Sequence, residues 1–398
     1  MAGERLERET PAVEAERLRA LPPYLFEELT RLKNEKIAAG VDIIDLSIGD
    51  PDTGAPPLAV EALRKYAGDR RLDRYTPAWA VEKFCVSAAR FMRERYGVDL
   101  DPASEIAPVI GTKEGIANLS LAVVDPGSVA LVPDPGYPVY SRSVGFAGGE
   151  AEYMRLEEEN GFLPDFEGVR NERPRLVYLN YPNNPTSAVA GPCLYAGAVA
   201  YGGRTGALIV NDAAYNEITF DGYVSPSILQ VEGGAEAAVE FHSFSKTYGV
   251  PGWRVGFAAG RRDAVRALKT LKSNVDSGVP GMMLLAARDM LEGGADYIGD
   301  TLGEYAMRRA LVHEALEAAG IEYHRSPATL YVWARVPGEM KSLDFAGLLL
   351  ERAGLIVAPG VGFGPGGEGY FRLSITCPRE DIARAGERIE EVSQTWRT

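Results

Sequence analysis

Short apolar runs alternate with helical stretches between about residues 50 and 276, and this alternation constrains the fold more than any other feature of the chain. Runs without polar residues are typical of strands that are buried on both faces of a sheet. Strands that alternate with helices form units whose strands pair in parallel. We therefore predict an α/β fold with a mostly parallel sheet. The predicted strands are 107–110, 129–132, 176–179, 208–210, 239–242 and 255–258.

The rest of the chain predicts a second, smaller domain. A long helical stretch covers 282–319 with a break at Glu292-Gly-Gly294, and strands are predicted at 329–336 and 370–376. An apolar-periodic helix at 24–39 ends at Gly40, and the charged arm before it could lie on a partner subunit. The predicted parts are the arm and first helix, which joins the small domain (1–48), a large domain that holds the site (49–285) and a small α+β domain (286–398).

A lysine stands at the end of a predicted buried strand, in Ser243-Phe-Ser-Lys246-Thr-Tyr-Gly-Val-Pro-Gly-Trp-Arg254. A buried lysine is unfavourable unless it is paired or used chemically. The serines and Arg254 are the donors that a phosphate ester needs. A lysine amine beside a phosphate site indicates covalent binding of pyridoxal phosphate. The alternative is a surface turn with an incidental lysine.

Two further polar segments follow apolar runs. Asp212 and Tyr215 stand just beyond the run 207–210, and ligands gather at the carboxyl ends of parallel strands. A carboxylate there can pair with a protonated pyridine nitrogen, and the tyrosine can donate to a phenolic oxygen of the same ring. After the run 176–179, a proline-rich loop exposes two asparagines, the second of which is Asn184. Its amide could share that oxygen or contact a substrate carboxylate. Each segment is also consistent with an ordinary turn.

In this order, the three segments resemble those of the class I and II aminotransferases, the fold type I pyridoxal-phosphate enzymes. The resemblance covers nearly the whole chain from about Leu21. It implies a large domain with a seven-stranded type of sheet between helices, a smaller α+β domain, and a cytoplasmic homodimer that serves amino-acid biosynthesis. Within the family the chain is most similar to the LL-diaminopimelate aminotransferase branch, which acts in lysine biosynthesis. The segments that carry this likeness are 21–26, 111–115, 134–140, 157–164 and 272–278.

The resemblance implies a role at the cofactor for each matching residue. Lys246 would bind pyridoxal 5'-phosphate covalently and later move the substrate proton, and Asp212 would pair with the pyridine nitrogen. Tyr215 and Asn184 would bond to the phenolic oxygen. Tyr137 would stack on the ring, although a packed core tyrosine is the alternative. The phosphate would lie at a helix N-terminus, among Thr112, Lys113, Ser243, Ser245, Arg254 and, from the neighbouring subunit, Tyr75.

The substrate side depends on an arginine in a predicted strand. Arg372 is flanked by aromatic and apolar residues, where a cation needs an anionic partner. A guanidinium binds a carboxylate with two parallel hydrogen bonds. The family uses this position for the substrate's α-carboxylate, and a structural salt bridge is the alternative. Asn184 and Gly49 would line the same pocket. The implied reaction moves an amino group from an L-amino acid to a 2-oxo acid such as 2-oxoglutarate.

Departures from the family concern the substrate. Beyond Tyr75 the chain has Ala78-Trp79-Ala80, where relatives that use diaminopimelate often place an acidic residue that reaches the distal amine in the neighbouring site. Trp79 could favour an apolar or aromatic substrate, so diaminopimelate specificity is a hypothesis. A pyridoxal-phosphate C–S lyase of the cystathionine β-lyase type shares the fold and the lysine site. A non-enzymatic effector sensor would need an appended DNA-binding domain, for which the segment before Leu21 is too short.

Composition argues against several other classes of protein. The net charge is -14 and basic residues are dispersed, which disfavours nucleic-acid binding. No apolar run approaches membrane-spanning length, and three cysteines without paired spacing fit a reducing cytoplasm. The three histidines lack metal-ligand spacing, so we expect no metal. The glycine-dense segment 359–369 precedes a strand rather than a helix, which indicates a hinge or lid loop rather than a nucleotide loop.

Overall fold

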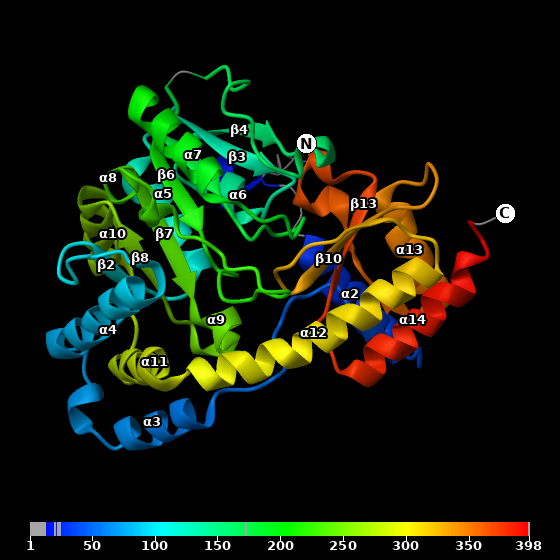
Figure 1. Ribbon diagram of the computed structural model, residues 1–398, viewed down its shortest axis with the longest axis horizontal. Coiled ribbons are helices and arrows are strands. Elements are labelled where there is room, and N and C mark those ends of the chain that lie inside the picture. Colours follow the sequence, from blue (N-terminus) through cyan, green and yellow to red (C-terminus); the bar gives the residue numbers. More distant parts are fainter. Residues whose placement is uncertain (1–12, 20, 22–24, 172, 397–398) are drawn as a thin grey trace, which may run out of the picture.

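The structure is a computed structural model that describes residues 13–19, 21, 25–171 and 173–396. Two sheets organise these residues, with the larger sheet in the left half of Figure 1 and the smaller one in the right half. The predicted arm lies mostly outside the described residues; its described part holds the short helix α1 (Glu16–Arg19). No helix within the described ranges is both long enough and apolar enough to cross a membrane.

The larger sheet has seven strands in the order β2-β8-β7-β6-β5-β3-β4. The strands from β7 to β4 pair in parallel, while β8 pairs antiparallel with both β7 and β2. The prediction of a mostly parallel α/β sheet is therefore confirmed. The strands are β2 (Ile106–Val109), β3 (Val129–Asp134), β4 (Glu150–Arg155), β5 (Leu176–Leu179), β6 (Leu208–Asp212), β7 (Ala238–Ser243) and β8 (Gly256–Gly260).

Strand β4 is the member of this sheet that the sequence did not predict. It forms one edge of the sheet, and along its six residues only Met154 is buried. An edge strand with exposed faces needs no apolar run, because little of its surface meets the core. The pattern that reveals the inner strands is therefore missing from this one.

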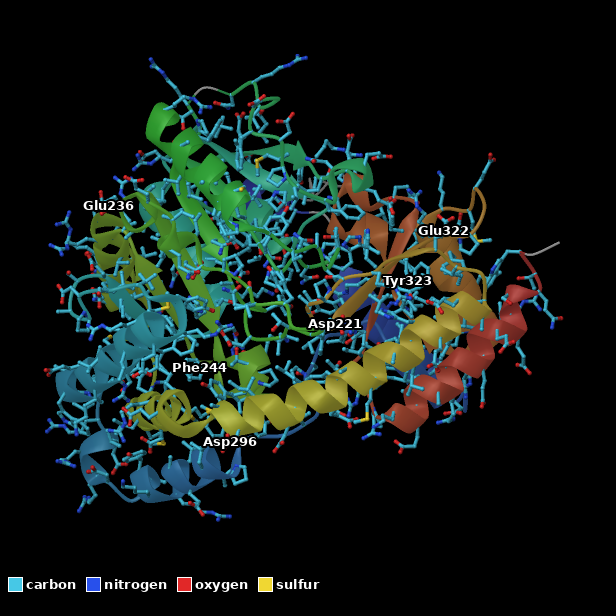
Figure 2. All side chains as sticks on the ribbon, viewed as in Figure 1. Asp221, Glu236, Phe244, Asp296, Glu322 and Tyr323 are labelled. Carbon is cyan, nitrogen blue, oxygen red and sulfur yellow. The ribbon has the colours of Figure 1, made fainter. Side chains whose placement is uncertain are left out.

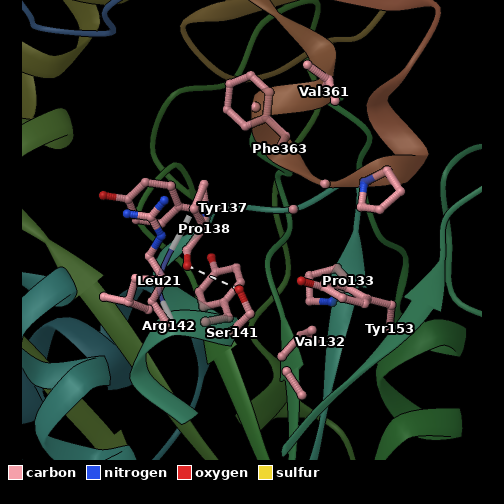
Figure 3. Close-up of a pocket in the computed structure, with 16 residues that line it drawn as sticks. Leu21, Val132, Pro133, Tyr137, Pro138, Ser141, Arg142, Tyr153, Val361 and Phe363 are labelled. Carbon is pink, nitrogen blue, oxygen red and sulfur yellow. Dashed lines mark hydrogen bonds between the residues drawn. The ribbon is translucent and has the colours of Figure 1, made fainter. Parts of the chain in front are cut away.

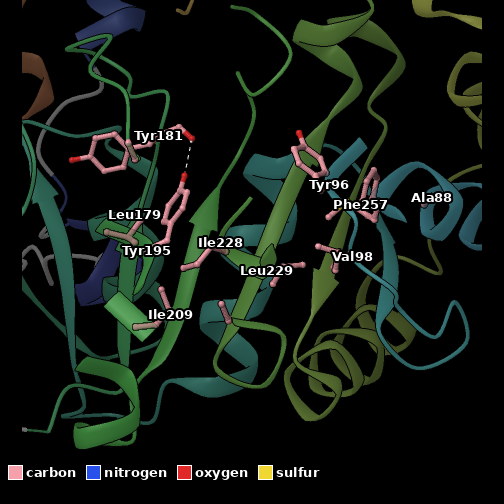
Figure 4. Close-up of a cluster of buried hydrophobic side chains, with 14 of the residues drawn as sticks. Ala88, Tyr96, Val98, Leu179, Tyr181, Tyr195, Ile209, Ile228, Leu229 and Phe257 are labelled. Atoms are coloured by element: carbon pink, nitrogen blue, oxygen red, sulfur yellow. Dashed lines mark hydrogen bonds between the residues drawn. The ribbon is translucent and has the colours of Figure 1, made fainter. Parts of the chain in front are cut away.

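Helices cover both faces of the larger sheet, and successive residues of a strand face opposite cores. On β6, Ile209 packs with Tyr195 and Leu179 in one cluster (Figure 4), whereas Val210 packs with Leu119 in the other. The helices of the first face are α4 (Ala78–Tyr96), α7 (Pro192–Thr205) and α11 (Gly281–Gly293). Those of the second are α5 (Thr112–Val123), α6 (Val139–Phe146) and α10 (Arg262–Val275).

A four-stranded antiparallel sheet, in the order β12-β13-β10-β9, organises the C-terminal part. Its core joins Tyr305, Phe345 and Phe371. Figure 2 shows Phe244 on the larger-sheet side and Tyr323 on the smaller-sheet side, with α12 running between them. The elements are β9 (Tyr323–His324), β10 (Tyr331–Arg335), β12 (Ala358–Pro359), β13 (Tyr370–Ser374), α12 (Ala295–Ala318), α13 (Ser342–Ala353) and α14 (Arg379–Ser393).

The predicted first helix packs against the smaller-sheet part. Leu29 of α2 (Leu25–Ala38) clusters with Leu350 and Ile356. Gly294 separates α11 from α12, which confirms the predicted break in the long helical stretch. The domain boundaries at 48 and 285 stay a prediction. The remaining elements include β1 (Ile44–Asp45) parallel to β11 (Leu355–Ile356), α3 (Pro57–Ala67), α8 (Gly234–Ala237) and α9 (Phe244–Thr247).

The glycine-dense segment forms two short 3-10 turns, Gly360–Phe363 and Pro365–Gly367, and leads directly into β13. It is tied to the end of β3 in the larger sheet. The Gly366 N–H donates to Asp134 Oδ1 at 2.7 Å, and the Gly136 N–H donates to the Phe363 carbonyl at 2.8 Å. In this structure the segment bridges the two sheets, and its role as a hinge or lid stays a prediction.

Candidate active site

The predicted site residues gather where β5, β6 and β7 end, at the carboxyl edge of the parallel sheet. All of them except Tyr75 line one cavity of about 290 Å³. Residues that are far apart in the sequence therefore share one space between the two sheets. The predicted residues that line it are Gly49, Thr112, Lys113, Tyr137, Asn184, Asp212, Tyr215, Ser243, Ser245, Lys246, Arg254 and Arg372.

Lys246 lies in α9, a single helical turn that follows β7 directly. The Ser243 hydroxyl caps this turn by accepting the Ser245 N–H at 3.2 Å. The Lys246 ammonium points across the cavity and donates to the Gly49 carbonyl at 2.5 Å. A strand end followed by a capped turn thus holds the amine at the mouth of the sheet, where it can reach a bound molecule.

Asp212 is the last residue of β6, and only 4% of its surface is exposed. The Tyr140 hydroxyl donates to Asp212 Oδ2 at 3.0 Å, while Oδ1 has no hydrogen-bond partner among the described residues. Burial raises the pKa of Asp212 to about 6, although the hydrogen bond from Tyr140, the backbone N–H of Ala214 and the nearby His242 act in the opposite direction. A buried carboxylate with one unsatisfied oxygen is suited to a cationic N–H partner.

One end of the cavity gathers hydrogen-bond donors. Helix α5 begins at Thr112, and its first two residues, Thr112 and Lys113, line the cavity, so the positive end of the helix lies there. Arg254 lies close by, with Nη2 donating to the Ile110 carbonyl at 3.3 Å. Gly111 has φ +78°, and a Cβ there would lie 2.4 Å from Arg254 Nη2. A glycine is therefore required before the helix, and this donor set matches what a phosphate group needs.

Arg372 lies in the middle of β13 and is 2% exposed. Its Nη1 donates to Asn184 Oδ1 at 2.6 Å, and its Nη2 donates to the Ser47 carbonyl at 2.6 Å. The guanidinium contacts two aromatic rings, with its carbon 3.9 Å from the Tyr331 ring centroid and 4.7 Å from that of Phe363. These two ring contacts and two hydrogen bonds hold the guanidinium in place at the cavity wall.

Two tyrosines that the sequence did not indicate also line this cavity. Tyr140 donates to Asp212, as described above, and its ring stacks on Tyr178 with centroids 5.1 Å apart. The Tyr331 hydroxyl lies 3.0 Å from that of Tyr215. Tyr140 follows Tyr137 by three residues in one helical turn, and that spacing could have revealed it. Tyr331 precedes the apolar residues 332–334 of its strand, and no signal in the sequence distinguishes it.

Tyr75 lies elsewhere. It is 86% exposed and lines a separate cavity of about 510 Å³ together with Thr76, Val279 and Leu284. It makes no contribution to the cavity of its own chain.

A third hollow, of about 550 Å³, adjoins the candidate site behind Tyr137. Figure 3 shows it between α6, with Ser141 and Arg142, and the glycine-dense segment, with Val361 and Phe363. No group of three or more His, Cys, Asp or Glu residues in the described part of the chain could hold a metal ion.

The family model for aminotransferase class I and II matches residues 41–389. Among curated proteins, the LL-diaminopimelate aminotransferase of Desulforudis audaxviator is 45% identical over 380 residues, which is 95% of this chain and 97% of the relative. The LL-diaminopimelate aminotransferase of Aquifex aeolicus is 43% identical over 384 residues, covering 95% of this chain and 98% of that protein.

Solved structures agree with these sequence relatives. Substrate-bound BacF from Bacillus subtilis superposes with a TM-score of 0.92 at 32% identity, covering 96% of this chain and 98% of that one. A probable N-succinyldiaminopimelate aminotransferase from Thermus thermophilus gives a TM-score of 0.88 at 33% identity, covering 92% of this chain and 100% of its own. The similarity therefore extends over both sheets.

Proposed function

The chain belongs to the class I and II aminotransferase family, and from that premise we propose that its cavity transfers an amino group between LL-diaminopimelate and a 2-oxo acid such as 2-oxoglutarate. Amino transfer and the use of pyridoxal 5'-phosphate are properties of this family and of this enzyme. The choice of substrate and the role of each residue are our proposal. The curated relatives named above are LL-diaminopimelate aminotransferases, which favours transfer over the C–S lyase alternative.

The residues present fit the cofactor. The unsatisfied Asp212 Oδ1 suits the pyridine N–H, and the start of α5 with Ser243, Ser245 and Arg254 supplies donors for the phosphate. When it is bound, pyridoxal 5'-phosphate withdraws the electrons released as a bond to the substrate's α-carbon breaks. In our proposal Lys246 holds the cofactor covalently and carries the α-proton, and Tyr137 packs on the ring.

The observation that carries the proposal is the convergence of Lys246 and Arg372 on one cavity from two different sheets. An amine that reacts with a carbonyl and a guanidinium that can bind a carboxylate are the two groups that an α-amino acid requires. We assign the carboxylate to Arg372 with Asn184 and Gly49 beside it. Tyr215 and Asn184 are assigned to the phenolic oxygen of the cofactor.

The support for diaminopimelate comes from the curated relatives, and the segment around Trp79 limits it. Trp79 packs against a buried cluster that includes Leu72 and Leu285, and two cations lie over its ring, with Arg71 5.0 Å and Lys83 5.3 Å from the ring centroid. Through these contacts the Trp79 side chain helps to pack α4 against its neighbours. This arrangement weakens the alternative in which Trp79 selects an apolar substrate.

An absorbance titration tests the proposal. The protein is loaded with pyridoxal 5'-phosphate and mixed separately with LL-diaminopimelate, L-alanine and L-phenylalanine, with Lys246→Ala as the background. We expect only LL-diaminopimelate to remove the band of the lysine-bound cofactor rapidly, and 2-oxoglutarate to restore it. Loss of the band with phenylalanine alone would replace the substrate proposal. No change with any amino acid would contradict amino transfer itself.

We also propose that the enzyme is a homodimer in which Tyr75 reaches the phosphate of the neighbouring site. The exposed position of Tyr75 beside an apolar hollow and outside its own cavity supports this. Sedimentation equilibrium should give twice the chain mass of 43.0 kDa; a monomer would contradict the proposal.

The thiols of Cys85, Cys193 and Cys377 are unpaired, which fits a cytoplasmic location that cell fractionation can test.

A further inference from the structure

Tyr331 lies at the start of β10, on the smaller sheet, yet it contacts groups of the larger-sheet side. Its ring packs with Ala214 and Tyr215, which follow β6. A Cβ on Gly49 would lie 2.2 Å from the Tyr331 hydroxyl, so the ring closes on the site only because that residue is glycine. The Ser187 hydroxyl donates to the Tyr331 carbonyl at 2.8 Å and fixes the strand there.

The Tyr331 side chain contacts both a proposed substrate-binding residue and a proposed cofactor-binding residue. The Arg372 guanidinium carbon lies over its ring, 3.9 Å from the ring centroid, and its hydroxyl lies 3.0 Å from the Tyr215 hydroxyl. Arg372 is the proposed carboxylate group, and Tyr215 the proposed donor to the phenolic oxygen. One residue therefore connects the substrate end of the cavity with the cofactor end.

The pair of hydroxyls has a choice of direction, because each carries one proton. If Tyr215 donates its hydroxyl proton to a hydrogen bond with Tyr331, Tyr215 cannot donate a hydrogen bond to the cofactor. If Tyr331 donates to Tyr215, the Tyr215 proton is available to the cavity. In a hydrogen-bonded pair of phenols, the more acidic one is the better donor. The direction therefore depends on the charges around Tyr331.

Four charged or titratable groups face Tyr331 from the elements packed against it. Burial raises the pKa of Tyr331, but the charges of Arg372 and Lys246 and the hydrogen bond with Tyr215 outweigh burial and the opposing Asp50, so its pKa lies below the ordinary value. Burial and the neighbouring Tyr331 hold the pKa of Tyr215 well above the ordinary value. Tyr331 is thus the more acidic partner and the preferred donor.

We propose that Tyr331 is a positioning residue that transmits carboxylate binding at Arg372 to Tyr215: a bound carboxylate offsets the Arg372 charge and so changes the hydrogen bond available to the cofactor's phenolic oxygen. This inference rests on the proposed function for the identity of the two ends. Arg372 also donates to Asn184, which gives a second, independent route between the same ends. Loss of the Tyr331 hydroxyl should weaken the coupling without removing it.

The test uses the full-length, cofactor-free protein labelled with 13C at the tyrosine Cζ, with glutarate as the carboxylate probe. The signal that is missing from Tyr331→Phe identifies Tyr331. We expect its pKa to lie below the ordinary value of about 10 and to rise when glutarate binds, because the carboxylate offsets the Arg372 charge. Tyr305→Phe, which alters a buried tyrosine of the small-sheet core, should leave this signal and its response unchanged.

Two variants separate the ring from the hydroxyl. Tyr331→Phe keeps the stacking surface and should bind glutarate within about twofold of the wild type, whereas Tyr331→Leu should bind it about 3- to 30-fold more weakly, as a desolvated cation–π contact implies. In the holoenzyme, glutarate should shift the pKa of the visible band less in Tyr331→Phe than in the wild type. If Tyr331 had a purely structural role, glutarate would not change the pKa of Tyr331, and Tyr331→Phe would not change the glutarate-induced shift in the pKa of the visible band.

The outcomes distinguish this inference from the proposed function. A Tyr331 pKa that is ordinary, or that ignores bound glutarate, overturns the inference while leaving amino transfer untouched. A protein that does not bind millimolar glutarate overturns the assignment of Arg372, and both proposals with it. A Tyr331 signal that responds to glutarate in a protein without amino-transfer activity upholds the coupling and overturns the proposed function alone.

Discussion

On the larger-sheet side of the cavity, Lys246 and Asp212 stand where strands end, whereas on the smaller-sheet side Arg372 stands in the middle of β13, and Tyr331, which begins β10, packs beside it. A strand end can present a polar group because the chain leaves the core there and its turn supplies capping bonds. Within a strand, a polar side chain must be satisfied by its neighbours.

The two sides meet that requirement differently. Lys246 rests on a single carbonyl, that of Gly49. Arg372 is held by two oxygens and two aromatic rings. In our proposal the weakly held Lys246 amine is the mobile reactive group, and the firmly held Arg372 is the rigid binding group. Preorganised binding groups with a mobile proton carrier suit a reaction in which one amine must leave and return.

Removing the mobile amine should have the largest effect. Lys246→Ala should lower kcat on the order of 10⁴-fold or more, because the covalent attachment and the proton carrier disappear together. Glutarate affinity, measured by calorimetry, should stay within about twofold, since Arg372 is held by other residues. Lys36→Ala, at a lysine of α2 that pairs with Glu351 away from the cavity, serves as the lysine control. Turnover at the wild-type rate by Lys246→Ala with bound cofactor would refute the assignment.

Changing Arg372 should have an effect of intermediate size, and the effect should fall on KM rather than on kcat. Arg372→Lys keeps the charge but loses the planar fork, so KM for the amino acid should rise about 10- to 100-fold. The Kd for pyridoxal 5'-phosphate should hardly change. Arg335→Lys is a matched control, because Arg335 lies on the paired strand β10 with an exposed side chain that bonds to Glu158. A change in cofactor affinity that matches the change in KM would show that the two sides are not separable.

The same contrast explains what the sequence could predict. Buried parallel strands have continuous apolar runs, so the inner strands of the larger sheet were predictable and edge strand β4 was not. At strand ends a polar residue interrupts an apolar run, which made Asp212 and Lys246 visible. Arg372 was visible only because an arginine in an apolar strand is unusual.

Tyr331 could not be predicted from the sequence, because its residue type is not unusual at its position. A tyrosine in a strand beside valine and tryptophan is ordinary, and its importance comes from Tyr215 and Arg372, which other parts of the chain supply. Those contacts form only when the two sheets meet. Gly49 was assigned to the pocket lining, and the structure adds that its missing side chain makes room for Tyr331. Contacts between distant segments are what a local pattern does not contain.

The smallest predicted effect concerns stability on the strand-end side. Burial raises the pKa of Asp212 from about 3.9 in an unfolded chain to about 6, so between these values the folded cofactor-free protein binds more protons than the unfolded one. Stability contributed by this group therefore falls as pH rises through that window. Asp212→Asn should remove the penalty and stabilise the cofactor-free protein at pH 7 by up to about 3 kcal/mol. The gain should vanish near pH 4.

Urea unfolding at a series of pH values measures this difference, with Asp125→Asn at an exposed position as the control. His313, whose pKa burial lowers to about 4, titrates in the same window with the opposite sign, so the wild type must be subtracted at each pH. Adding pyridoxal 5'-phosphate should reverse the order and favour the wild type, because only the carboxylate can pair with a pyridine N–H as an ion. If the Asp212→Asn protein is no more stable than the wild type at pH 7, the buried Asp212 carboxylate carries no penalty in the cofactor-free protein. The polar groups at the strand ends would then be as well paired as Arg372, and the contrast between the two sides of the cavity would fail.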